Sequence, residues 1–252
     1  MKSGGISLIL GKERTSREYA EHYFETESEM AGLFRLDTAI LNSLIAQGSV
    51  FDAMMGPGRH VVHLARRGLS VHGNDFNRHM VDVAGKQLRK EKLKANLTNY
   101  DVTDLSAIKS GSFGTVICMY NALGSIMGSD KRQAAVSEMA RVCKSGGRVI
   151  LHTHNLFGDL SNWDDIRNLI DNFLARPKGL GRGDFVAHDR YLGNTFQHFF
   201  TAREVSEMFS KAGLSVEKKI FLRSWRQDRI AHGPLREFLS GGFIFVGRKA
   251  RR

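Results

Sequence analysis

Cysteine and proline are scarce in this sequence, and long apolar runs are missing. The two cysteines, Cys118 and Cys143, lie in apolar neighbourhoods and do not form a paired framework, which favours a reduced, intracellular protein. Three prolines leave little room for a proline-rich linker. No run reaches the roughly 18 apolar residues that span a bilayer, and the early ISLIL segment is too short for a signal-peptide core. These features predict a cytoplasmic protein without a membrane partner.

The composition that remains is that of an ordinary globule with a basic surface. The 252 residues are 42% hydrophobic, which predicts a single domain over residues 1–252 with a sizeable core. Lys and Arg number 37 against 26 acids, so the net charge is +11. Such a charge attracts RNA or anionic metabolites, although clustered surface charge is more often a solvated helix face. RNA therefore stays open as a partner.

Short apolar runs alternate with helical patterns after residue 49. The expected strands are residues 50–53, 70–74, 96–101, 114–120, 146–154, 214–222 and 241–247. Helical patterns separate them, for example at residues 77–93 and 130–142, and the TARE segment at 201–204 caps a further helix. Strands separated by helices imply parallel crossovers, so we predict an open α/β sheet with helices on both faces.

Two segments fall outside this alternation. Residues 1–48 contain a possible capping box, TSRE at 15–18, followed by amphipathic spacing, and predict an N-terminal helical cap. Residues 155–200 break the rhythm and predict an irregular insertion above the strand ends, where a lid over a substrate would lie. A surface excursion without function is the alternative.

The stretch FDAMMGPGRH, residues 51–60, places Gly56 and Gly58 behind an acid, Asp52. In open α/β sheets a ligand binds where the first strand turns into its helix, and bare glycines let the backbone approach it. Asp75 ends the second apolar run, at about the distance downstream where a carboxylate accepts hydrogen bonds from ribose hydroxyls. Turn and acid together predict an adenosine-like ligand.

NAD and S-adenosylmethionine both fit that description. The dinucleotide fingerprint requires a third glycine where this chain has Val61, so the glycine that packs helix against strand is missing. A phosphate P-loop is excluded because no Lys-Ser or Lys-Thr follows the turn.

Residues 15–248 resemble the class I S-adenosylmethionine-dependent methyltransferases. The segments that carry the resemblance are DAMMGPGRH, Asp75 followed by Phe76, YDVTDL with Asp101, FGTVICMYNALGSI, MARVCKSGGRVILHTHN, and HFFTAREVSEMFSKAGLSVEKKIF followed by GGFIFVG. The resemblance implies a Rossmann-like, seven-stranded, mostly parallel sheet with an antiparallel last strand, and methyl transfer from S-adenosylmethionine. One position departs from the family, because Met54 stands where its loop usually has a first glycine. We expect this flexible side chain to point into the core beneath the loop rather than crowd the cofactor.

The resemblance also implies a set of cofactor contacts. Gly56 and Gly58 would pass close to the amino acid end of the cofactor, Asp75 would bind both ribose hydroxyls, and Phe76 or Val102 would contact the adenine face. Asp101 would accept from the adenine amine, or else be a turn or helix-cap carboxylate. The same expected site includes Asp52, Tyr120, Tyr19 and Tyr23.

The acceptor is expected where the fourth and fifth strands end. Tyr120 and Asn121 leave the fourth strand and His154 leaves the fifth, so Asn121, His154 and the later His198 are candidates for catalysis. Either histidine could instead be structural. Lys178, Arg182 and Arg190 in the insertion could hold an anionic acceptor.

Several acceptor classes lack their signatures here. The YNALG exit has no Asn/Asp-Pro-Pro-aromatic motif, neither cysteine is placed as a nucleophile, and Tyr120 and Asn121 stand where a magnesium-dependent enzyme would place a carboxylate. CMYNALGSI is similar to the glycine and sarcosine type of N-methyltransferase, which favours metal-independent transfer to oxygen or nitrogen of a small metabolite. The alternatives are a tRNA methyltransferase acting on modified wobble uridines, suggested by RYLGNTFQHFFTAREV, and a non-catalytic cofactor-binding scaffold.

Overall fold

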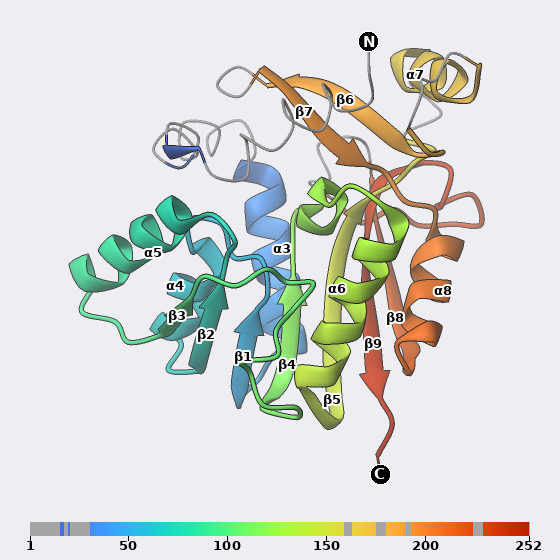
Figure 1. The fold of residues 1–252 in the computed structure, drawn as a ribbon. Helices are drawn as coiled ribbons and strands as arrows, with labels where there is room; N and C mark the ends of the chain where they lie inside the picture. The colour runs from blue at the N-terminus through green and yellow to red at the C-terminus, as the bar shows by residue number, and fades with distance from the viewer. Residues whose placement is uncertain are drawn as a thin grey trace.

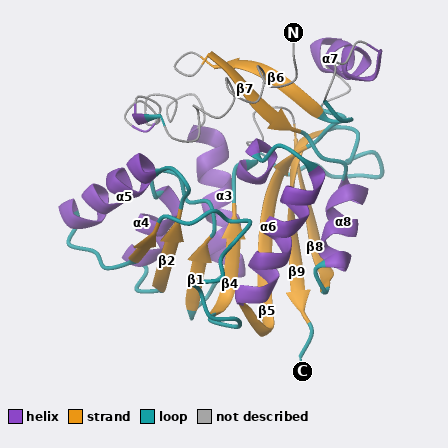
Figure 2. Ribbon diagram, viewed as in Figure 1, coloured by secondary structure: helices purple, strands orange, loops and turns teal. Residues whose placement is uncertain are grey.

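A seven-stranded sheet with helices on both faces forms the centre of this computed structural model (Figures 1 and 2). The structure describes residues 16, 17, 20, 31–158, 163–174, 180–189, 193–223 and 229–251. The helices are α3 (Ala31–Leu44), α4 (Arg59–Arg66), α5 (Arg78–Lys90), α6 (Ser129–Val142), α7 (Trp163–Leu174), α8 (Ala202–Lys211) and the short 3-10 helix η3 (Ala122–Ser125). The strands are β1 (Ser49–Asp52), β2 (Ser70–Asn74), β3 (Asn96–Thr98), β4 (Phe113–Cys118), β5 (Cys143–His154), β6 (Asp184–Asp189), β7 (Gly193–His198), β8 (Leu214–Arg223) and β9 (Ser240–Lys249).

The sheet has the strand order β3-β2-β1-β4-β5-β9-β8. The pairs among β1 to β5 are parallel, whereas β9 is antiparallel to both of its neighbours, β5 and β8. This arrangement confirms the predicted Rossmann-like sheet with an antiparallel last strand. The strand order reverses between β1 and β4, and ligands in open α/β sheets bind at such a switch point.

Both faces of the sheet are buried. Phe51 and Val116 pack on the face that α6 and α8 cover, while Val50 and Ile117 pack on the face that α3, α4 and α5 cover. Burial on both faces explains why β1 and β4 are near-continuous apolar runs in the sequence rather than alternating ones.

The insertion at residues 155–200 is more regular than expected. It contains α7 and an antiparallel hairpin of β6 and β7, which lies at the carboxyl ends of the sheet strands (Figure 1). The hairpin is joined to β5 by a bridge between Asn155 and Phe200. The sequence signal was weak because the segments DFVAHD and GNTFQH mix charged, polar and apolar residues and pair with each other, outside the main sheet.

The bounds of several elements differ from those predicted, and two of these differences concern segments with expected site residues. The strand expected at residues 96–101 ends at Thr98, and Asp101 lies in the turn that follows. Within the expected cap of residues 1–48, the structure describes α3, and most of the preceding residues, including Thr15, lie outside the described part.

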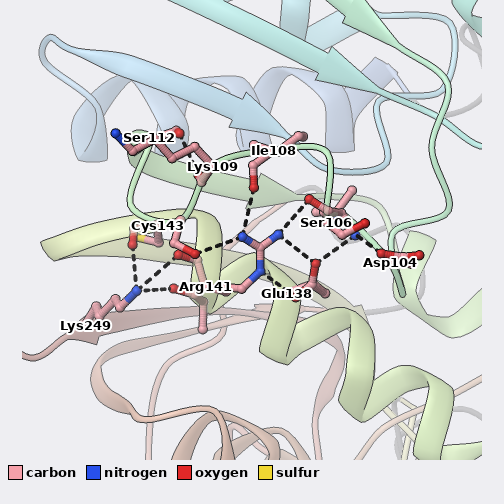
Figure 3. Close-up of polar contacts among 12 residues, drawn as sticks. Asp104, Ser106, Ile108, Lys109, Ser112, Glu138, Arg141, Cys143 and Lys249 are labelled. Atoms are coloured by element: carbon pink, nitrogen blue, oxygen red, sulfur yellow. Dashed lines mark hydrogen bonds and ion pairs between the residues drawn. The ribbon is translucent and has the colours of Figure 1, made fainter.

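A guanidinium at the end of α6 fastens the loop between β3 and β4 (Figure 3). Arg141 donates to the carbonyl oxygens of Leu105 and Ile108 at 2.6 and 2.8 Å, and to the hydroxyl of Ser110 at 3.0 Å. Glu138 pairs with Arg141 at 2.7 Å and accepts from the backbone N–H of Leu105 at 2.7 Å. The same loop carries Val102, so this network also supports a wall of the cavity described below.

We expect Arg141→Met to destabilise the protein, because two carbonyls and a carboxylate lose their donor. The guanidinium makes five hydrogen bonds. At about 0.5–1 kcal/mol each for these part-buried contacts, their loss should lower the free energy of unfolding by about 2.5–5 kcal/mol, measured by urea denaturation. The matched control is Arg203→Met, which breaks an exposed i,i+4 pair with Glu207 and should leave the midpoint unchanged. Equal midpoints for the two variants would contradict this role.

Candidate functional site

A cavity of about 230 Å3 opens at the carboxyl ends of β1, β2 and β4. The glycine turn after β1, the end of β2, the exit of β4 and strand β7 all contribute side chains to its wall. Its lining includes Asp52, Met54, Gly56, Arg59, Asn74, Asp75, Phe76, Tyr100, Val102, Tyr120, Asn121, Thr195 and Gln197. Cofactor residues expected from the sequence therefore meet there, together with residues that the sequence did not suggest.

The two glycines of the turn serve different purposes. Gly56 has φ 55°, lines the cavity, and would have open space around an added Cβ. Gly58 has φ 88° and begins α4, and a Cβ there would lie 2.6 Å from the Cβ of Ala84 on α5. Gly56 keeps the cavity wall bare, whereas Gly58 allows α4 and α5 to pack closely, so only the first contributes to the lining.

Asp75 lies directly after β2 and holds the glycine turn in place. Its Oδ2 accepts from the backbone N–H of Gly56 at 2.8 Å, and its Oδ1 accepts from that of Asn77 at 2.8 Å. The carboxylate thus lies in the cavity wall and fixes the backbone of the glycine turn and of the residues that follow β2.

Asp52 ends β1 and is only 1% exposed. Its Oδ2 has no hydrogen-bond partner among the described residues. Burial, followed by the charge of Asp75, raises the pKa of Asp52 to about 8. At neutral pH the carboxyl group is thus protonated, and a cation that entered the cavity beside it would favour its ionised form.

The two methionines that follow Ala53 have different surroundings. Met55 is buried in the core, packed against Gly73. Met54 is partly buried, packs against the core cluster on the α6 and α8 face, and also lines the cavity. Met54 was expected to point into the core beneath the loop. It does contact the core, but it also forms part of the cavity wall.

At the other end of the cavity, aromatic and apolar groups form the wall. Phe76 is 42% exposed and lines the cavity with Tyr100 and Val102. Asp101 does not line it, since its Oδ1 accepts from the backbone N–H and the hydroxyl of Thr103, both at 2.9 Å. Of the residues expected near an adenine, the structure thus brings Phe76 and Val102 to the cavity and places Asp101 in a turn-capping position.

Asn74, which the sequence reasoning passed over, is buried at the centre of this wall. Its amide donates to the carbonyl oxygens of Ala53 and Tyr100, both at 3.1 Å, and its Oδ1 accepts from the backbone N–H of Tyr100 at 2.9 Å. It therefore ties the ends of three neighbouring segments together. A polar residue at the last position of a strand was the available signal.

The exit of β4 has an unusual backbone. Tyr120 and Asn121 have φ values of 55° and 53°, a conformation that non-glycine residues adopt infrequently and that collects at functional sites. The Tyr120 ring packs edge-on against Phe34 and His154. Both residues line the cavity. That an acceptor approaches at this place stays a prediction.

The two candidate histidines lie outside the cavity lining. His154 packs between Tyr120 and Phe199, its Nε2 has no partner among the described residues, and burial with the charge of His152 lowers its pKa to about 3. His198 is 2% exposed and contacts Asp184 at 2.6 Å and Glu204 at 3.0 Å. Burial would lower the pKa of His198, but hydrogen bonds to these two carboxylates outweigh it and raise the pKa.

The remaining expected contacts fall elsewhere. Tyr19, Tyr23, Lys178 and Arg190 lie outside the described residues. Arg182 is described, but it is exposed and does not line the cavity.

Helix α3 contributes an ion pair beside the glycine turn that the sequence did not reveal. Arg59, in the cavity wall, donates to both carboxylate oxygens of the fully buried Asp37 at 2.9 and 2.7 Å. The Arg59 guanidinium also stacks on Phe34 at 3.9 Å. Hydrogen bonds from His60 and Arg59 overcome the effect of burial and hold the pKa of Asp37 well below its ordinary value. An acid on the apolar face of the predicted helix was the only local signal.

The described residues carry neither a metal-binding group nor a membrane-spanning helix. No group of three or more His, Cys, Asp or Glu side chains is arranged to hold a metal ion in the part of the chain that the structure describes. None of the described helices has the length and hydropathy of a membrane-spanning segment.

Comparison with known proteins gives this geometry a family context. Residues 50–147 match the family model described as a methyltransferase domain, a segment that includes the glycine turn, Asp75 and the β4 exit. The comparison with curated proteins gave no match.

Several solved structures share the fold over most of their length. A SAM-dependent methyltransferase from Methanosarcina mazei is 22% identical over 82% of this chain and 94% of its own, with a TM-score of 0.67. One from Clostridium acetobutylicum is 12% identical over 91% and 97%, with a TM-score of 0.61. The magnesium protoporphyrin IX methyltransferase of Synechocystis, with bound SAH, is 16% identical over 87% and 84%, with a TM-score of 0.60. At such identities the likeness concerns the fold.

Proposed function

We propose that this chain, a class I S-adenosylmethionine-dependent methyltransferase, transfers the methyl group to an oxygen or nitrogen atom of a small metabolite, without a metal ion. The observation that carries the proposal is the pairing of two carboxyl groups, Asp52 and Asp75, around the bare Gly56 turn at the switch point of the sheet. The family match covers these residues, while the acceptor is our inference from the rest of the cavity.

The residues of the cavity fit the cofactor. The buried Oδ2 of Asp52 lacks a partner among the described residues, and an ammonium group such as that of the cofactor's amino acid end would supply both the charge and the hydrogen bond. Asp75, a carboxylate in the cavity wall beside the Gly56 turn, would bind the ribose hydroxyls, and Phe76 and Val102 would contact the adenine. Tyr120 extends the same wall towards the acceptor side. Tyr19 and Tyr23 keep their expected role of covering the cofactor.

The protein contributes alignment more than acid–base chemistry. When bound, S-adenosylmethionine supplies a methyl group on a sulfonium centre, which an in-line nucleophile displaces. The chain's part is to hold the nucleophile in line and exclude water, a contribution that can reach about 7–11 kcal/mol. The rigid positive-φ turn at Tyr120 and Asn121 and the wall from β7 suit that task, because both lie in the cavity and are fixed by hydrogen bonds.

A general base is needed only if the acceptor must lose a proton. His154 is neutral and packs against Tyr120, so it is the residue to examine for such a role. His198 has both ring nitrogens engaged by carboxylates, which suits an anchor for the insertion rather than a base. In this proposal residues 155–200 form the acceptor lid, with Thr195 and Gln197 facing the cavity.

The test is a screen of labelled methyl transfer from S-adenosylmethionine into the small-molecule and RNA fractions of a cell extract. We expect label in the small-molecule fraction with the unaltered protein and none above background with Asp75→Ala. Label confined to RNA would replace the small acceptor with a nucleic acid. Cofactor binding by calorimetry without transfer into either fraction would contradict the enzymatic role.

A further inference from the structure

The orientation of one side-chain amide in the cavity follows from a chain of hydrogen bonds that begins at a backbone group. The backbone N–H of His154 donates to Asn121 at 3.0 Å, and because an N–H can only donate, the atom it meets must be the amide oxygen Oδ1. The Nδ2 of Asn121 lies 3.2 Å from the carbonyl oxygen of His198, which can only accept. Two independent partners thus fix the Asn121 amide in the same orientation.

That orientation determines the next amide. The same Nδ2 of Asn121 is 2.9 Å from Gln197, so the atom of Gln197 that faces it must be the acceptor Oε1. The Nε2 of Gln197, with two N–H donors, is then the free end of the chain. Among the described residues it has no protein partner, and Gln197 lines the same cavity as Asp52 and Asp75.

The strand that carries Gln197 is fixed from several sides. Gln197 pairs with Phe185 in the β6–β7 hairpin, and its neighbour His198 is held between the carboxylates of Asp184 and Glu204. The close approach of β7 to η3 depends on Gly124, because a Cβ there would lie 2.5 Å from the carbonyl oxygen of His198. A donor held this firmly loses little conformational entropy when it binds a ligand.

We propose that Gln197 determines acceptor specificity by presenting its two N–H donors to an oxygen atom of the methyl acceptor. This inference rests on the proposed function, which supplies the acceptor, and it narrows the substrate class to molecules that carry a carbonyl, carboxylate or phenolate oxygen near the methylated atom. A substrate that presents an ammonium group at this place would meet donors only. The selectivity thus has two sources: the hydrogen bonds that an oxygen atom of the acceptor would make, and the unpaired donors that an ammonium group would leave.

The first test addresses the orientation and needs no ligand. In an NMR hydrogen-exchange experiment on 15N-labelled protein, the side-chain NH2 of Asn121 should exchange slowly and that of Gln197 rapidly. Asn121→Asp keeps the acceptor for His154 but removes the donor to Gln197, and it should alter the Gln197 NH2 signals. Slow exchange of Gln197 with rapid exchange of Asn121 would overturn the proposal.

The second test uses benzoate and benzylamine as probes, measured by ligand-observed NMR with S-adenosylhomocysteine present and without it. With S-adenosylhomocysteine present, which would cover Asp52 and Asp75, we expect benzoate to bind about 10–100-fold more tightly than benzylamine, as for a hydrogen bond to a charged group. Gln197→Met should reduce this preference about tenfold or more, and Gln197→Glu should reverse it. The matched control is Gln133→Met on α6, which removes an amide that bonds Ser137 and Met208 outside the cavity and should change nothing.

An unchanged preference in Gln197→Met, or failure of benzoate to bind, would overturn the proposal. Calorimetry with S-adenosylhomocysteine on the same samples separates this outcome from failure of the proposed function. Loss of cofactor binding contradicts the function alone, while the difference in probe preference between Gln197→Met and the unaltered protein, measured without cofactor, still decides the role of Gln197.

Discussion

Replacement of Asp75 by alanine should weaken S-adenosylmethionine binding by about 10²–10⁴-fold. Two charge-assisted hydrogen bonds at about 1.5–3 kcal/mol each would be lost, and tenfold in affinity is about 1.4 kcal/mol. The carboxylate also accepts from the backbone N–H of Gly56, so its removal frees the turn that the cofactor must pass. Isothermal titration calorimetry with S-adenosylmethionine and S-adenosylhomocysteine measures the effect directly.

Two further variants make the Asp75 result interpretable. Asp75→Asn keeps the shape and one acceptor oxygen but removes the charge, so its affinity should fall between that of the unaltered protein and that of Asp75→Ala. Asp82→Ala removes a half-exposed carboxylate on α5 and should leave the affinity unchanged. Unchanged affinity in Asp75→Ala, with its melting temperature preserved, would count against the whole assignment of the cofactor site.

Asp52→Asn should stabilise the cofactor-free protein. In the folded state the pKa of Asp52 is about 8, against an ordinary value of 3.8 for an aspartate side chain. The folded state thus keeps a proton that the unfolded state releases, and the free energy of unfolding falls as pH rises from about 4 to 8. Asparagine cannot ionise, so its stability relative to the unaltered protein should rise over that pH window by about 1.4 kcal/mol for each unit of pKa difference, on the order of several kcal/mol in all. Urea denaturation at pH 5 and pH 8 compares the two proteins.

The same substitution should impair cofactor binding. An ammonium group beside Asp52 would lower the pKa of its carboxyl group, so the protein should release close to one proton on binding at pH 7, and affinity should rise with pH towards 8. Calorimetry in buffers of different ionisation enthalpy detects that proton. Asp52→Asn should bind more weakly and release none from this site. A variant that is neither more stable at pH 8 nor weaker in binding would contradict the cationic contact.

The fold was largely predictable because its signals are local. The apolar runs at β1 and β4 are continuous since both faces of the sheet are buried, and each is followed by a helical pattern. The hairpin of β6 and β7 escaped prediction because its strands pair only with each other and carry few apolar residues in regular alternation. A regular alternation of apolar residues predicts a buried strand. Strand β7 instead contributes the polar side chains of Thr195 and Gln197 to the cavity wall.

The residues expected to bind the cofactor could also be predicted from local sequence patterns. Asp52, Gly56 and Asp75 each stand at a strand end, where the β–turn–α pattern places them at one edge of the sheet. The sequence could not distinguish Gly56 from Gly58, because only the packing of α4 on α5 gives Gly58 its structural role.

By itself, the sequence determined the sheet, its helices and the carboxyl groups that surround the glycine turn, because hydrophobic periodicity and strand-end residues act over a few positions. Only the tertiary structure decided which side chains from distant segments share the cavity. Asn121 and Gln197 are 76 positions apart, and Arg59 meets Asp37 across 22. Such contacts depend on how the hairpin and α3 pack against the sheet. No local sequence pattern encodes which residues meet across so many positions.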